Sequence, residues 1–123
     1  MAMIRLQTQP VIRLRRATSF VDRLVGLLGR SAVDPDEALL IDGCRAVHTL
    51  GMRMSIDVVF LSSNNVVVDV SENLAPWRFA FCANSRRVLE LQASATRRFR
   101  IKPGAYLQLG FSTLQIIQPE GGK

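Results

Sequence analysis

The clearest pattern in the chain is a two-residue alternation of side chains along residues 52–61. One face of this segment is an apolar row: Met52, Met54, Ile56, Val58 and Phe60. The opposite face begins with polar residues and ends with apolar ones: Arg53, Ser55, Asp57, Val59 and Leu61. A period of two predicts a β-strand. We expect this strand to run from a site or a sheet edge into the core.

Other short segments are rich in apolar and β-branched residues, which indicates further strands. They cover residues 4–6, 11–14, 38–41, 66–70, 87–91, 106–111 and 114–117. The turn signal Ser62-Ser63-Asn64-Asn65 predicts a hairpin between the central strand and residues 66–70. Short connections of this kind favour antiparallel pairing.

Helical spacing of apolar residues occurs in residues 19–28, with Ser19 placed as the N-cap and Gly29 as the residue that ends the helix. A second short helix is possible over residues 93–100. Together these elements predict a β-rich α+β domain. It would be a mostly antiparallel sheet or a small, partly closed barrel, with one amphipathic helix and the possible second one.

Two loops are expected to carry polar groups. Residues 43–51 have a glycine at each end, and we expect this loop to bring Cys44, Arg45, His48 and Thr49 to the mouth of the central strand. Residues 71–83 form a longer predicted loop that contains Pro76-Trp77-Arg78. Trp77, the only tryptophan, is expected to cover the core.

Length and composition predict one domain over residues 1–123, with residues 118–123 as a tail. The chain has 123 residues, of which 48% are hydrophobic, enough for an ordinary core. It has no apolar run long enough for a transmembrane helix, and its N-terminus lacks the apolar core of a signal peptide. A cytoplasmic location is therefore the default expectation. A secreted or periplasmic location stays open if a leader precedes the sequence.

The chain is basic, with a formal net charge of +6, and 14 of its 16 basic residues are arginine. A basic surface raises the question of nucleic acid. However, the arginines are scattered, and aromatic residues of the kind that stack on bases are not interleaved with the arginine clusters. We therefore expect no specific nucleic-acid partner, and only weak, sequence-independent binding that disappears near physiological salt.

The two cysteines, Cys44 and Cys82, form no CxxC motif and do not cluster with histidines, so no metal site is expected. Two free thiols are the expectation for a cytoplasmic chain, and a disulfide between them is the alternative elsewhere. The sequence contains no glycine-rich phosphate loop and no dinucleotide fingerprint. No cofactor is expected.

Several short motifs occur in a particular order along residues 17–109. They are GLLGR at 26–30, VHTLGMRMSIDVVFL at 47–61, PWR at 76–78, VLEL at 88–91 and KPG at 102–104. With these motifs the chain resembles the bacterial family called domain of unknown function 192. The resemblance implies a compact, mainly β domain and no established activity.

Two sets of residues invite chemical interpretations. Cys44, His48 and Asp57 supply a nucleophile, a base and an orienting group, so a small hydrolase is one alternative. Asp57 and Glu90 each lie in a predicted strand among apolar residues, where a bare carboxylate is costly. Glycosidase-like chemistry would use these two carboxyls as a pair. We instead expect them to form a structural ionic network with arginine, and the candidate partners are Arg30, Arg53 and Arg78.

The preferred interpretation is a non-catalytic binding or accessory domain. Its pocket would contain His48, Thr49, Arg53 and Arg78, a set suited to an anionic small molecule or to the carboxylate of a peptide or saccharide. We further expect His48 to line a part of the pocket that solvent can reach. The hydrolase is the first alternative, and weak nucleic-acid binding is the second.

Overall fold

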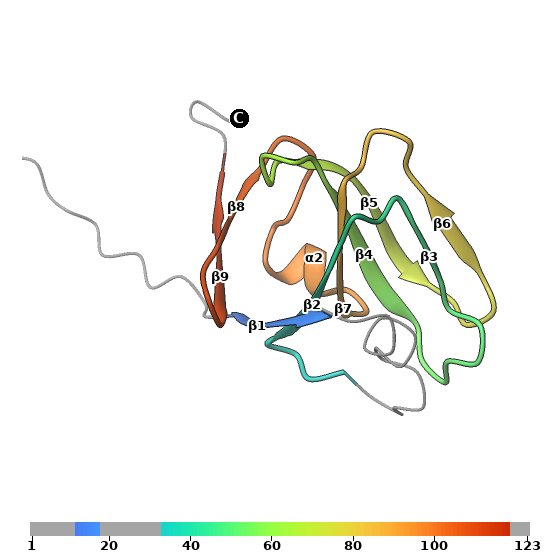
Figure 1. Ribbon diagram of the computed structural model, residues 1–123. Coiled ribbons are helices and arrows are strands. Elements are labelled where there is room, and N and C mark those ends of the chain that lie inside the picture. The colour runs from blue at the N-terminus through green and yellow to red at the C-terminus, as the bar shows by residue number, and fades with distance from the viewer. Residues whose placement is uncertain (1–11, 18–32, 119–123) are drawn as a thin grey trace, which may run out of the picture.

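The described part of the protein, residues 12–17 and 33–118 of the computed structural model, is a strongly curled β-sheet with a small second sheet against one side (Figure 1). One short helix, α2, lies within the curl. The elements in chain order are β1 Ile12–Ala17, β2 Glu37–Asp42, β3 Ala46–His48, β4 Ile56–Leu61, β5 Val67–Leu74, β6 Phe79–Phe81, β7 Arg87–Gln92, α2 Ala95–Arg98, β8 Tyr106–Leu109 and β9 Thr113–Ile117.

The large sheet has seven strands in the order β5-β4-β7-β2-β1-β9-β8. All neighbouring pairs are antiparallel except β1 and β2, which are parallel. An isolated bridge between Val66 and Tyr106 joins the two ends of this order. The Val67 N–H also donates to the Ala105 carbonyl at 2.8 Å. The sheet is thus a half-barrel whose edge strands meet at one end.

Two hydrophobic clusters lie on the two faces of this sheet. The inner cluster fills the curl and includes Ala95 of α2. The outer cluster lies between the sheet and the small β3–β6 sheet. β4 contributes to both, since Val59 and Leu61 belong to the inner cluster and Val58 and Phe60 to the outer one. All six residues of β4 are buried, which explains why its sequence ends as a nearly continuous apolar run.

The small sheet pairs β3 and β6 antiparallel, with Ala46 opposite Phe81 and His48 opposite Phe79. Its inner side packs Val47 and Ala80 against the outer cluster. Because neighbouring residues of a strand point to opposite faces, His48, Phe79 and Phe81 lie on the outer side. In Figure 1 this sheet is at the right, away from β1, β8 and β9.

The β-rich prediction and the hairpin between β4 and β5 are confirmed. The described residues contain one short helix, Ala95–Arg98, inside the predicted segment 93–100. The expectation of two helices therefore finds no support there. The predicted helix over residues 19–28, the strand over residues 4–6 and the tail from residue 119 lie outside the described residues.

Three boundaries need correction. The central strand begins at Ile56 instead of Met52, because the chain leaves the turn at Gly51 (φ +80°) through bends at residues 53 and 54 that pair with no strand. Each of the two predicted loops contains a strand, β3 in the first and β6 in the second.

No helix within the described ranges is long and apolar enough to span a bilayer.

Candidate binding face

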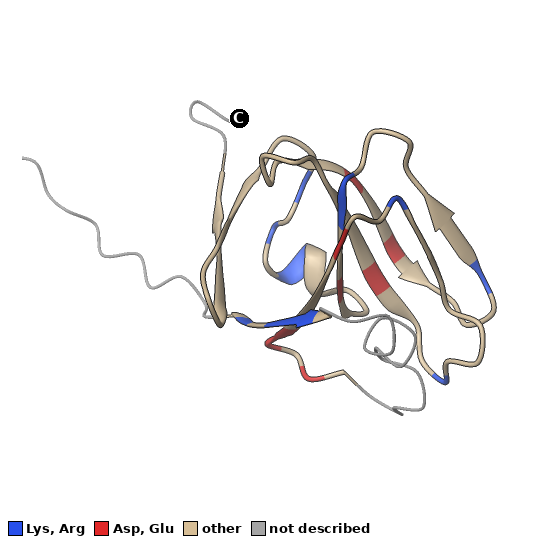
Figure 2. Cartoon of the chain, in the orientation of Figure 1, with Lys and Arg blue, Asp and Glu red and all other residues tan. Residues whose placement is uncertain are grey.

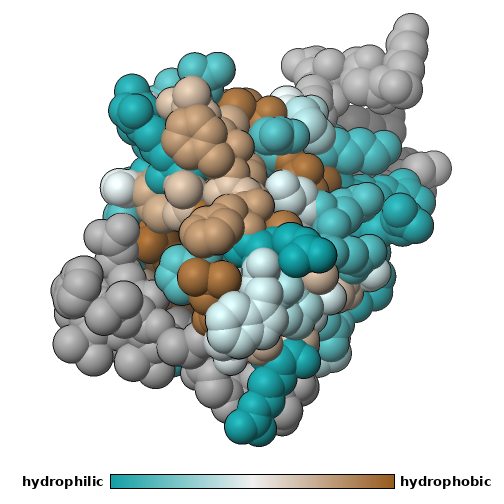
Figure 3. All heavy atoms as spheres, turned by 90° about the vertical axis from the view of Figure 1, so that its right-hand side faces the viewer, coloured by the Kyte–Doolittle hydropathy of each residue, from teal (hydrophilic) through white to brown (hydrophobic). Residues whose placement is uncertain are grey.

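The outer side of the β3–β6 sheet exposes large aromatic side chains. The exposed fractions are 71% for Phe79 and 67% for Phe81, and Trp77, just before β6, is 63% exposed. His48 on β3 is exposed as well. We call these four residues the aromatic face. Figure 3, which turns this side toward the viewer, shows apolar residues gathered among hydrophilic ones. The expectation that Trp77 covers the core is therefore wrong.

His48 is held against its neighbour across the small sheet. Its ring centroid lies 6.2 Å from that of Phe79, with the rings tilted by 58°. Its Nδ1 accepts a hydrogen bond from the Leu50 N–H at 3.3 Å. The imidazole is exposed to solvent as part of a sheet face, and the pocket expected around it stays a prediction.

Thr49 lies under the aromatic face and holds the backbone before β6 by hydrogen bonds. It is fully buried, and its hydroxyl donates to the Ala75 carbonyl at 2.6 Å and accepts from the Arg78 N–H at 2.9 Å. Its own carbonyl accepts from the Trp77 N–H at 3.0 Å. Thr49 therefore fastens residues 75–78 to the end of β3. This arrangement corrects the prediction that Thr49 contacts a ligand, since its hydroxyl is used within the protein.

Four of the five arginines around this sheet have no acidic partner among the described residues. The two segments that build it, residues 43–56 and 75–89, contain five arginines and no aspartate or glutamate. Only Arg87 has a carboxylate partner, Asp42. The other four are exposed and form no salt bridge within the described residues: Arg45, Arg53, Arg78 and Arg86. Figure 2 shows basic positions, in blue, on the loops around β3 and β6. The described residues around the aromatic face thus carry positive charges that no neighbouring carboxylate balances.

Comparison with known proteins gives the chain a family. A family model for DUF192, described as "Uncharacterized ACR, COG1430", matches residues 3–109. The chain belongs to the DUF192 family. This agrees with the resemblance drawn from its motifs.

Individual relatives of this DUF192 domain extend the comparison. The UPF0127 protein PF1050 of Pyrococcus furiosus is 42% identical over a match that covers 55% of this chain and 60% of that relative. The chain thus spans about three fifths of that relative's length. Two crystal structures have the same fold. One is a protein of unknown function from Novosphingobium aromaticivorans, with a TM-score of 0.69, 18% identity, and coverage of 85% of this chain and 74% of that one. The other, R01717 from Sinorhizobium meliloti, is named as a candidate transcription regulator, with a TM-score of 0.70, 22% identity, and coverage of 85% and 81%.

The structure does not bring the three residues of the hydrolase alternative together in this DUF192 domain. The Cys44 thiol donates to the Ala46 carbonyl at 2.7 Å instead of bonding to His48. Asp57 lies on the other face of the large sheet, beside α2. Cys44 and Cys82 are free and half-buried.

Asp57 is fully buried, and donors other than arginine satisfy its carboxylate. Oδ1 accepts from the backbone N–H groups of Asn73 at 2.8 Å and Ser94 at 3.0 Å. Oδ2 accepts from the N–H of Thr96 at 2.9 Å and from its hydroxyl at 2.6 Å. The carboxylate therefore stabilises the first turn of α2, where backbone N–H groups lack intrahelical partners.

Glu90 points the other way. It stands opposite Leu39 on β2 and Val58 on β4, both part of the outer cluster, whereas Asp57 stands opposite Leu91 of the inner cluster. The two carboxyls therefore share neither an ionic network nor a substrate site, and Arg30 lies outside the described residues. Glu90 forms no salt bridge with a described residue. Burial raises its pKa from 4.5 to about 7.

The sequence contains a signal for the aromatic face that does not coincide with its arginine clusters. Aromatic residues alternate at positions 77, 79 and 81, with Arg78 between the first two. This period of two indicates a strand with one aromatic side. Because this strand has only three residues, the sequence pattern predicted a loop there.

Proposed function

We propose that this DUF192 domain is a non-catalytic binding domain whose anionic ligand docks on the aromatic face. The observation that carries the proposal is the exposure of Trp77, Phe79 and Phe81, at 63–71%, beside arginines that have no acidic partner in residues 12–17 and 33–118. Clusters of exposed apolar side chains on a domain surface mark interaction sites. Aromatic residues and arginine are also the types enriched at such sites.

The charge of the surrounding residues supports an anionic ligand. Arg53 and Arg78, expected from the sequence as ligand contacts, are both exposed; Arg78 directly precedes β6, and Arg53 follows the turn after β3. Guanidinium groups bind carboxylates and phosphates through paired hydrogen bonds. No carboxylate of the described residues pairs with these two arginines, so a ligand anion displaces no internal ion pair there.

A titration with small anions tests the proposal. Inorganic phosphate, glucuronate and an acidic peptide would be added while the fluorescence of the single tryptophan is recorded. NMR signals of the single histidine ring provide a second reporter on the same face. We expect at least one compound to change both signals and Arg78→Gln to weaken its binding about tenfold, as for one charge-assisted hydrogen bond.

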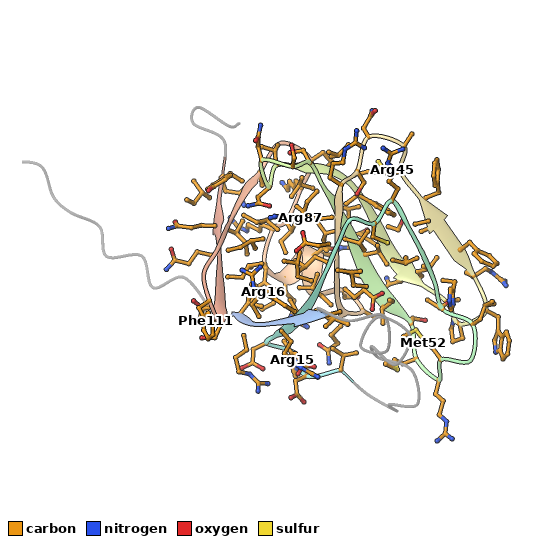
Figure 4. All side chains as sticks on the ribbon, viewed as in Figure 1. Arg15, Arg16, Arg45, Met52, Arg87 and Phe111 are labelled. Carbon is orange, nitrogen blue, oxygen red and sulfur yellow. The ribbon has the colours of Figure 1, made fainter. Side chains whose placement is uncertain are left out.

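The matched control is Arg15→Gln, because Arg15 is 60% exposed on β1 and Figure 4 shows it away from the small sheet. This variant should bind like the parent. Equal weakening by both arginine substitutions, or silence of both reporters toward every anion, would contradict the proposal.

A further inference from the structure

We infer that the aromatic face binds single-stranded nucleic acid, with bases stacked on Phe79 and Phe81 and phosphates held by the surrounding arginines. This inference rests on the proposed function and names the class of anion. It also changes the expectation of weak, purely electrostatic binding, because Phe79 and Phe81 are exposed and can stack on bases.

The spacing of the rings supports a single strand. Phe79 and Phe81 are two residues apart on β6, so their side chains lie about 7 Å apart along the strand. Stacked bases in a duplex are only about 3.4 Å apart. Bases splayed from an extended single strand can each occupy one ring, as on other sheet platforms that bind nucleic acid.

The chemistry of the two phenylalanines also favours bases. Their rings have no hydrogen-bonding group, so they select a ligand by its flat faces. Every base has such a face, and stacking on aromatic residues therefore tolerates any sequence. His48, beside Phe79, supplies a further ring at the same end of the small sheet.

The arginines complete the requirements of a polyanion site. Arg45 and Arg78 directly precede β3 and β6, and Arg53 and Arg86 lie in the segments that follow these strands. These segments have no acidic residue that would repel phosphate. Arg45 is labelled beside the small sheet in Figure 4. On a single strand, each phosphate contact contributes about −0.7 to the slope of the logarithm of the association constant against the logarithm of the salt concentration. If each of the four arginines contacts one phosphate, this slope should be about −3.

Fluorescence anisotropy with a labelled oligo-dT of about 12 nucleotides, a typical length for a single-strand site, tests this inference. Binding would be measured between about 50 and 200 mM salt, with Trp77 fluorescence as the site reporter. Three competitors share its charge and lack free bases: an abasic strand, a duplex and inorganic polyphosphate. Vesicles of anionic phospholipid form a fourth arm.

The expected result separates rings from charges. Phe79→Ala and Phe81→Ala should each weaken oligo-dT binding about 5- to 150-fold at every salt concentration, as base stacking predicts. Arg78→Gln should reduce the salt slope by about 0.7. Phe111→Ala is the matched control, because Phe111 is 96% exposed on the β8–β9 turn, far from the small sheet (Figure 4). It should change nothing.

The other outcomes are also decisive. Equal binding of oligo-dT, abasic strand and polyphosphate would overturn base stacking and leave the binding of anions on this face intact. Binding of vesicles without binding of oligo-dT would overturn the inference in favour of a membrane surface. Silence toward every polyanion and every small anion would overturn both the inference and the proposed function.

Discussion

Thr96 donates both its backbone N–H and its hydroxyl to one oxygen of Asp57, at 2.9 and 2.6 Å. The two residues are 39 positions apart, one on β4 and the other in the first turn of α2. The N-cap residue of α2, Ser94, makes no side-chain cap of its own. A strand carboxylate thus performs the capping that helices usually obtain from a neighbouring residue.

Asp57→Ala should destabilise the protein by about 3 kcal/mol, because three N–H groups, that of Thr96 buried and the other two part-buried, and a buried hydroxyl lose a charged acceptor. Thr96→Val, which removes only the hydroxyl, should cost about 1 to 2 kcal/mol. Urea unfolding measures both. Asp69→Ala, on the exposed side of β5, is the control and should stay within about 0.5 kcal/mol of the parent. An Asp57→Ala variant as stable as the parent would show that the carboxylate contributes nothing.

Stability should fall as pH rises from about 4.5 to 7, because burial raises the pKa of Glu90 to about 7 in the folded protein. Below its unfolded pKa of about 4.5, Glu90 is protonated in both states and imposes no penalty. Above about pH 7 Glu90 is ionised in both states, and the free energy of unfolding is lower than at pH 4.5 by roughly 3 kcal/mol.

Glu90→Gln should remove this dependence, so that the stability of the variant relative to the parent increases across that pH range. Urea unfolding at a series of pH values measures the difference, and Glu72→Gln on exposed β5 is the control. Parallel curves for Glu90→Gln and the parent would mean that Glu90 ionises normally.

Thr49→Val should release residues 75–78 from the end of β3. The hydroxyl exchanges hydrogen bonds with Ala75 and Arg78, and their loss should cost about 1 to 3 kcal/mol. Because Arg78 adjoins Trp77, the tryptophan emission of the folded variant should also shift. Thr113→Val on exposed β9 should alter neither quantity. Unchanged emission with a large loss of stability would show that Thr49 supports the fold without positioning the face.

Phe79→Ala and Phe81→Ala should leave folding stability within about 1 kcal/mol of the parent, because both rings are exposed. Phe60→Ala, in contrast, should cost about 3 to 5 kcal/mol, since Phe60 is 1% exposed in the outer cluster. Thermal unfolding of the three variants compares them directly. A loss of several kcal/mol from the β6 substitutions would assign these rings to the core instead of to binding.

The strands that alternate or run apolar over five or more residues were predictable from the sequence, as β4 and β7 show. Their residues are buried whatever their partners, so local hydrophobic pattern was sufficient. The special backbone of Gly43 and Gly51, both at positive φ, was anticipated for the same local reason. A buried, satisfied Asp57 followed from the cost of a bare carboxylate in a core.

Only the tertiary structure decided where the candidate face lies. β3 and β6 have three residues each, too few for a period to establish a strand, and each exists because the other pairs with it from a distant part of the chain. The same pairing buries Thr49 and leaves Phe79 and Phe81 in solvent. Residue type alone ranks a threonine as exposed and a phenylalanine as buried. Which face a side chain occupies depends on partners that the local pattern does not contain.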